Sequence, residues 1–387
     1  MKVKPADRTA SVQEYYFSQK LAQIEMMRKQ GADVINLGIG SPDQAPSENT
    51  ISALIAESQK PTSHGYQSYT GIPLLRKAFA DWYNKYFHVK LNPDNEILLL
   101  MGSKEGIMHI SMAFVNPADE VLVPDPGYPT YSSVTNLVGG VIRKYELDEE
   151  NGWLPDLKSL EKEDLSKVKL MWVNYPNMPT GVAGSMELFE ELIAFSKRHR
   201  ILLVNDNPYS FILNKKYNSL LAVKDAFETA LELNSLSKSH NMAGWRIGMV
   251  AGNSDYIKSI LKVKSNMDSG MFLGMQMAAV EALNNQDSWY SSVNKIYMKR
   301  RKIVEEIMDL LKCRFDKSQV GLFLWGRIPE EIINCELFIE ELLNKYHVFI
   351  TPGSIFGEKG NRYIRISLCT NEKRLLEAKE RLSIHSK

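Results

Sequence analysis

The feature that most constrains this chain is a lysine placed between two apolar runs. Residues 230–233 and 247–251 are mostly apolar, and each run indicates a short buried strand. The loop between them carries Lys238, eight positions before Arg246. A lysine between buried strands is poorly solvated, so its pKa falls and its neutral, nucleophilic amine becomes available near neutral pH. The alternative, a surface loop with two solvated cations, is less favoured because the flanks are too apolar for an exposed turn.

The residue types around this lysine indicate a particular cofactor. Lys238 can form a Schiff base with an aldehyde. Arg246 offers a planar fork for a phosphate, and Ser235 and Ser237 add hydroxyl donors. An amine, a guanidinium and hydroxyl groups together suit pyridoxal 5′-phosphate, which carries both an aldehyde and a phosphate. We therefore predict that Ser235, Ser237, Lys238 and Arg246 bind this cofactor.

The pattern S-x-x-K-x(7)-R-x-G over residues 235–248 resembles the Schiff-base motif of the class I and II aminotransferases, the pyridoxal-phosphate-dependent family of fold type I. The resemblance implies that Lys238 is the catalytic Schiff-base lysine. It also implies an α/β fold, in which helices flank a mostly parallel sheet and a smaller α+β domain packs beside it. The motifs described next follow the order that this family would require.

Two further segments resemble phosphate-binding parts of the family. Residues 96–101 predict a buried strand that turns at Gly102 and enters a helix, and helix N-termini bind anions. The resemblance assigns phosphate contacts to Ser103 and to the backbone of Lys104. Residues 64–76 match a Y-x(4)-G-x(3–4)-L-R motif, in which Tyr66 would reach the cofactor of a neighbouring subunit. The resemblance therefore implies a homodimer with shared active sites.

Three side chains at predicted strand ends complete the predicted cofactor site. Tyr128 follows the apolar run 120–124 in a P-G-Y-P-x-Y match, which assigns it to stacking on the pyridine ring; a turn tyrosine is the alternative. Asp206 follows the apolar run 201–204, where a carboxylate is costly unless paired; a solvated strand end is the alternative. The D-x-x-Y match implies that Asp206 pairs with the pyridine nitrogen of the cofactor and that Tyr209 donates a hydrogen bond to its phenolic oxygen.

The loop over residues 174–181 departs from the family at one position. It resembles the N-P-x-N-P-T-G motif, but Met178 stands where relatives carry an asparagine that hydrogen-bonds the phenolic oxygen. Methionine cannot donate a hydrogen bond. Asn177, one residue earlier, is the predicted replacement, and whether it reaches the oxygen stays open.

Two residues are predicted to bind the substrate carboxylate. Residues 33–43 indicate a short strand that enters a glycine loop, and the resemblance places the backbone N–H of Gly40 at the carboxylate. A plain turn explains that loop equally well. Arg365 alternates with apolar residues in a predicted strand, and the Y-x-R-I-S match makes it the carboxylate clamp. An exposed strand arginine is the alternative.

The predicted organisation is a large pyridoxal-phosphate-binding domain over residues 45–280 and a small domain formed by 1–44 together with 281–387. Helical patterns are expected from about Ser11 to Gln30 and from about Ser288 to Lys312.

Composition excludes several classes of protein. The 387 residues carry 47 Lys and Arg against 46 Asp and Glu, which gives no basic surface for nucleic acid. No apolar run approaches the roughly 20 residues of a membrane span. The three cysteines are widely spaced and fit a reducing cytoplasm, and the seven histidines lack metal-site spacing, so we expect no metal.

The resemblance implies an aminotransferase that moves the amino group of an α-amino acid to a 2-oxo acid. Two alternatives stay open. One is a C–S β-lyase of the same fold, which the sequence separates poorly from an aminotransferase. The other is a non-catalytic regulatory protein that binds the same cofactor; such proteins usually carry an added DNA-binding domain, and no residues remain here for one.

Overall fold

The computed structural model describes residues 3–10, 12 and 16–384, and a seven-stranded sheet in the order β2-β8-β7-β6-β5-β3-β4 forms its centre. The strands are β2 Ile97–Leu100, β3 Glu120–Asp125, β4 Val141–Glu146, β5 Val168–Val173, β6 Leu202–Asp206, β7 Ala230–Ser235 and β8 Gly248–Gly252. β8 runs antiparallel to both of its neighbours, and the remaining pairs are parallel. The predicted α/β fold with a mostly parallel sheet is confirmed.

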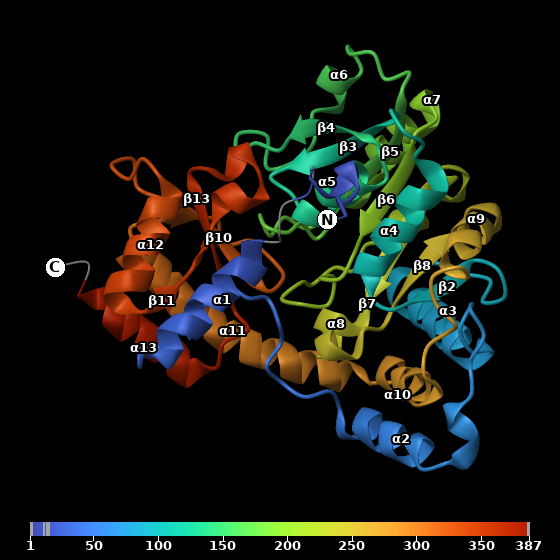
Figure 1. Ribbon diagram of the computed structural model, residues 1–387, viewed down its shortest axis with the longest axis horizontal. Coiled ribbons are helices and arrows are strands. Elements are labelled where there is room, and N and C mark those ends of the chain that lie inside the picture. Colours follow the sequence, from blue (N-terminus) through green and yellow to red (C-terminus); the bar gives the residue numbers. More distant parts are fainter. Residues whose placement is uncertain (1–2, 11, 13–15, 385–387) are drawn as a thin grey trace.

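Apolar residues fill both faces of this sheet because successive side chains of a strand point to opposite sides. On β5, Met171 and Val173 pack into one apolar cluster, while Leu170 and Trp172 pack into the other. Helices flank the sheet (Figure 1), while α2 packs against α10. The helices of residues 48–283 are α2 Glu48–Ser58, α3 Pro73–Phe87, α4 Ser103–Phe114, α5 Pro129–Leu137, α6 Leu157–Leu160, α7 Met186–His199, α8 Leu236–Ser239, α9 Ser254–Lys264 and α10 Leu273–Leu283.

A second, antiparallel sheet lies in the C-terminal part of the chain, in the order β12-β13-β10-β9. Its strands are β9 Arg314–Phe315, β10 Phe323–Arg327, β12 Thr351–Pro352 and β13 Tyr363–Ser367. The helices of this part are α11 Asp287–Leu310, α12 Cys335–Tyr346 and α13 Glu372–Ser383. In Figure 1, α11 runs along the base of the molecule from α10 toward the second sheet.

The N-terminal segment packs against the C-terminal part rather than against the large sheet. α1 (Tyr16–Lys29) contacts α12 through Lys20 and Glu340, and β1 (Ile35–Asn36) pairs in parallel with β11 (Val348–Phe349). The predicted helix start at Ser11 lies outside the described residues. The predicted domain boundaries at 44/45 and 280/281 stay a prediction.

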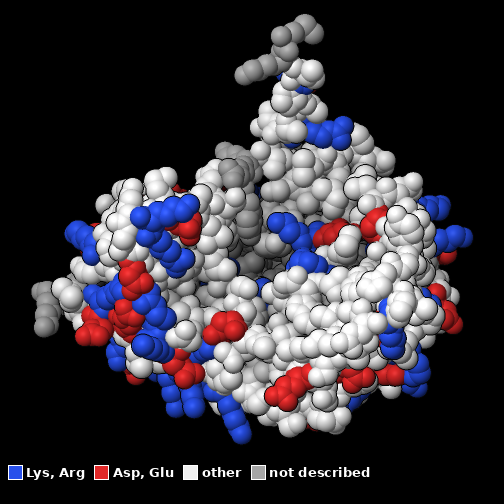
Figure 2. Space-filling model, turned by 60° about the horizontal axis from the view of Figure 1, so that its bottom comes forward, with Lys and Arg blue, Asp and Glu red and all other residues white. Residues whose placement is uncertain are grey.

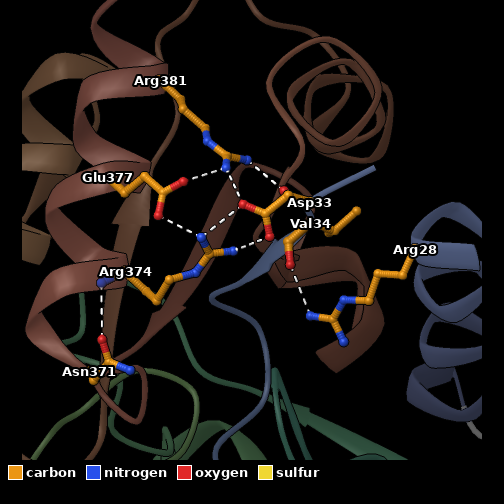
Figure 3. Close-up of polar contacts among 7 residues, drawn as sticks. All are labelled: Arg28, Asp33, Val34, Asn371, Arg374, Glu377 and Arg381. Carbon is orange, nitrogen blue, oxygen red and sulfur yellow. Dashed lines mark hydrogen bonds and ion pairs between the residues drawn. The ribbon is translucent and has the colours of Figure 1, made fainter. Parts of the chain in front are cut away.

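A cluster of ion pairs fixes this N-terminal segment to α13 (Figure 3). The Asp33 carboxylate accepts hydrogen bonds from Arg374 and Arg381, and both guanidinium groups also bind Glu377. The two arginines hold the pKa of Asp33 well below its usual range. Single surface ion pairs contribute little to the stability of a fold. This network therefore mainly fixes the direction in which the chain enters β1.

No helix in the described part of the chain is long and apolar enough to cross a membrane. The three cysteines, Cys313, Cys335 and Cys369, are buried and unbridged.

Candidate active site

A cavity of about 730 Å³ opens beside the carboxyl ends of the parallel strands, where the second sheet faces the first. Figure 2 shows the molecule hollowed between these two parts, with basic side chains inside the hollow. Eleven of the residues predicted from the sequence line the cavity: Gly40, Ser103, Lys104, Tyr128, Asp206, Tyr209, Ser235, Ser237, Lys238, Arg246 and Arg365. Ligand sites of α/β sheets lie at this edge because the strand ends leave a crevice there.

Lys238 lines the cavity because α8, which carries it, follows β7 directly at the carboxyl end of that strand. Its Nζ donates a hydrogen bond to the backbone carbonyl of Gly40 at 2.6 Å. Burial is the main cause that lowers the pKa of Lys238, and the positive charges of Arg365 and Arg246 act in the same direction. The poorly solvated environment predicted for this lysine is therefore present, whereas Arg246 in the same loop is exposed.

Asp206 ends β6 and is almost fully buried. Its Oδ2 accepts a hydrogen bond from Tyr131 at 3.1 Å, while its Oδ1 has no hydrogen-bond partner among the described residues. Burial raises the pKa of Asp206 to about 7. A buried carboxylate oxygen without a hydrogen-bond donor can accept a hydrogen bond from a ligand. Asp206 therefore fits a protonated pyridine nitrogen.

The phosphate end of the cavity is built from one helix start and one arginine. Gly102, with φ of 85°, caps α4, and the first N–H groups of a helix have no partner within it. A side chain on Gly102 would place Cβ 2.2 Å from Arg246 Nη2, so only glycine lets this guanidinium approach the helix start. The Ser235 and Ser237 hydroxyl groups lie 2.8 Å apart at the same end. These donors fit a phosphate.

The substrate end is formed by Arg365 of β13. Its guanidinium lies 3.9 Å from the ring centre of Phe323 and 4.6 Å from that of Phe356. It donates to the carbonyl of Gly38 at 2.8 Å and to the Met178 sulfur at 3.1 Å. The side chain is buried and borders the cavity, so the alternative of an exposed strand arginine is wrong.

Two predicted residues do not line the cavity. The Asn177 amide oxygen accepts hydrogen bonds from the backbone N–H and the hydroxyl of Thr180. These bonds hold the side chain within its own loop. Asn174 and Met178 border the cavity instead. Tyr66 is 92% exposed and lies outside the cavity of its own chain. Both roles stay predictions.

Sequence reasoning missed two polar residues of the site. Asn174 Oδ1 accepts from the backbone N–H of Met178, and Asn174 Nδ2 donates to the backbone carbonyl of Asp206. Tyr131 bonds the Asp206 carboxylate. Tyr131 is the last residue of the P-G-Y-P-x-Y motif, and Asn174 opens the loop that contains Met178. Both positions were visible in the sequence, but only the fold brings them to Asp206.

Comparison with known proteins extends over almost the whole chain. Residues 32–382 match the family described as aminotransferase class I and II. Relatives named LL-diaminopimelate aminotransferase, from Halothermothrix orenii and Aquifex aeolicus, are 40% and 39% identical over 379 residues, 97% of this chain and 97% and 98% of theirs. A substrate-bound BacF structure from Bacillus subtilis has a TM-score of 0.95 and 34% identity, covering 100% of this chain and 98% of that one.

Proposed function

The chain belongs to the class I and II aminotransferase family, and from that premise we propose that Lys238 is the residue that carries its cofactor. The protein is a pyridoxal-phosphate-dependent aminotransferase, which moves the amino group of an α-amino acid to a 2-oxo acid. The bound cofactor supplies an aldehyde carbon that takes up the amino group and a ring that accepts electrons. The observation that carries the proposal is the poorly solvated Lys238 amine, whose pKa is lowered and which shares one cavity with Asp206 and Arg365.

The other lining residues divide into three roles. The N–H groups at the start of α4 and the side chains of Ser235, Ser237 and Arg246 bind the phosphate. Asp206 holds the proton on the ring nitrogen, Tyr128 packs on the ring face, and Tyr209 donates to the phenolic oxygen. Lys238 has a lowered pKa, so its neutral amine can take up and release a proton at the substrate α-carbon.

Arg365 binds the α-carboxylate of the substrate. A guanidinium presents two parallel N–H groups to a carboxylate, and the rings of Phe323 and Phe356 limit its rotation. The Gly40 loop closes over the same end, where the carbonyl of Gly40 also accepts from Lys238. The names of the relatives make LL-diaminopimelate the first amino donor to test.

Borohydride reduction of the protein with pyridoxal phosphate, followed by peptide mapping, tests the assignment of Lys238. The pyridoxyl group is expected on Lys238, and a label on another lysine would overturn the assignment. Incubation with amino acids and 2-oxoglutarate then measures amino transfer. Release of pyruvate and ammonia from cystathionine, without amino transfer, would identify a β-lyase instead.

We propose further that the active unit is a homodimer whose chains exchange Tyr66. Its side chain is almost fully exposed, and the nearby elements expose apolar side chains such as Ile55 of α2 and Leu74 of α3. A Tyr66→Ala chain mixed with a Lys238→Ala chain tests this proposal. Hybrid dimers would hold one intact site, so activity should return on mixing. Proven hybrids without activity would contradict shared sites.

The proposed location is the cytoplasm. The three cysteines are buried and unbridged, as is usual for proteins of a reducing compartment. Cell fractionation followed by activity measurement checks the location, and activity outside the cytoplasmic fraction would contradict it.

A further inference from the structure

Tyr131 donates a hydrogen bond to one oxygen of the Asp206 carboxylate. It lies in the first turn of α5 and is 1% exposed. Its hydroxyl donates to Asp206 Oδ2 at 3.1 Å, while Oδ1 keeps no described partner. One oxygen of the carboxylate is thus held by the protein, and the other remains available to a ligand in the cavity.

The ring of Tyr131 is itself held on two sides. It stacks on Trp172 of β5 with ring centres 5.0 Å apart and planes 4° from parallel. Tyr128 meets it edge-on, at 5.6 Å and 86°. Trp172 is fully buried beneath the sheet, so the Tyr131 hydroxyl cannot leave Asp206 without disturbing this stack.

We propose that Tyr131 is a positioning residue that orients Asp206 and keeps it ionised, so that Oδ1 meets the ring nitrogen of the cofactor. This inference rests on the proposed role of Asp206. Asn174, which donates to the backbone carbonyl of Asp206, fixes the main chain, whereas Tyr131 fixes the carboxyl group. The two contacts together leave the carboxylate few orientations.

Electrostatics at this position favour such a donor. Burial raises the pKa of Asp206 to about 7, while the Tyr131 hydrogen bond and the positive charge of Lys238 lower it. Tyr209 also interacts with Asp206, and because burial raises the pKa of Tyr209, its neutral phenol adds no charge. Without the Tyr131 hydroxyl, the carboxyl would protonate at higher pH, and a neutral carboxyl cannot pair with a protonated ring.

The experiment compares two non-covalent ligands of the cofactor-free protein. Pyridoxamine 5′-phosphate has the ring nitrogen but no aldehyde, and its 1-deaza analogue carries carbon in place of that nitrogen. For Tyr131→Phe, affinity for pyridoxamine phosphate at pH 8 should fall roughly 10- to 100-fold, because a hydrogen bond to a charged group is lost. Affinity for the deaza analogue should stay within about twofold. The pH below which pyridoxamine phosphate binding weakens should also move upward.

Tyr145→Phe provides the matched control. Tyr145 is also buried, and its hydroxyl donates to the backbone carbonyl of Trp172 at 2.7 Å, away from Asp206. This variant should lose stability without changing the preference between the two ligands. Equal losses of both ligands in Tyr131→Phe would show that Tyr131 only packs and would overturn the inference. If the native chain itself did not prefer pyridoxamine phosphate to the deaza analogue, the proposed role of Asp206 would fail instead.

Discussion

At the phosphate end of the cavity, the contributing residues belong to the seven-stranded sheet or to the turns that leave it, whereas the substrate end joins segments from both halves of the chain. Ser103 begins α4 just after the turn that follows β2, and Ser235 ends β7. Arg365 comes from the second sheet, and the Gly38–Gly40 loop follows β1. The two ends therefore differ in how many parts of the fold must be correctly placed to form them.

This difference separates cofactor binding from substrate binding. The phosphate end is fixed by one sheet and its helix starts, so it keeps its shape if the second sheet moves. The substrate end changes whenever the second sheet moves relative to the first, because Arg365 and Lys238 lie on different parts. Variants at the phosphate end should therefore change the affinity for the cofactor, whereas variants at the substrate end should change the KM for amino acids.

The largest expected effect is at Lys238, where the two ends meet. Lys238→Ala should lower kcat by roughly 10²- to 10⁴-fold or more, the usual contribution of a positioned acid–base group. Single-turnover absorbance changes with an amino donor measure this loss. The phosphate-end donors remain, so retention of pyridoxamine phosphate should change little. Near-normal turnover would show that another group moves the proton.

The buried Asp206 carboxylate, at the cofactor end of the cavity, is expected to destabilise the cofactor-free protein when it is ionised. Folding raises its carboxyl pKa from 3.8 to about 7, so ionisation weakens the folded state increasingly above pH 4 and fully above pH 7. Asp206→Asn should therefore stabilise the cofactor-free protein by roughly 2–4 kcal/mol at pH 8. Denaturant unfolding at pH 8 and pH 5 checks this, and the gain should shrink by more than half at pH 5. A gain independent of pH would contradict it.

Arg365 and Arg246 allow the two ends to be compared with the same substitution. Arg365→Lys keeps the charge but loses the fork, and should raise KM for amino acids roughly 10- to 100-fold while cofactor affinity stays unchanged. Arg246→Lys should weaken pyridoxal phosphate binding instead. Steady-state kinetics at saturating cofactor, with separate cofactor titrations, distinguish the two outcomes. If both variants changed both quantities equally, the separation of the ends would be wrong.

The smallest expected effect is at Met178, whose sulfur is a weak acceptor for Arg365. Met178→Asn would supply an amide oxygen that holds the guanidinium more firmly. A neutral hydrogen bond contributes about 0.5–1.5 kcal/mol, so KM for the amino acid should fall roughly 2- to 10-fold. Met178→Leu, of similar volume, is the control and should not lower KM. An unchanged KM in the Asn variant would show that Arg365 is already fixed by Gly38 and the aromatic rings.

Residues predicted from the sequence line both ends of the cavity, among them Ser103 and Arg246 at the phosphate end and Gly40 and Arg365 at the substrate end. The turn at Gly102 and the stretch from Ser235 to Arg246 are local segments, so their residue types and their resemblance to family motifs can be seen without the fold. Asn177 shows the limit: the sequence places it beside Met178, but its amide bonds Thr180 and leaves the cavity edge to Asn174. In a loop, neighbouring side chains can point to opposite sides. The periodicity of the sequence does not show which of them points toward the site.

The sequence by itself determined the α/β order, the buried lysine and the residue types that suit pyridoxal phosphate, because these depend on apolar runs and short spacings. Only the tertiary structure decided which oxygen of Asp206 is available, which ring holds Tyr131, and what surrounds Arg365. The contacts from Tyr131 to Asp206 and from Arg365 to Gly38 join residues 75 and 327 positions apart. The energy of such contacts depends on packing between distant segments, which is fixed only when the whole chain has folded.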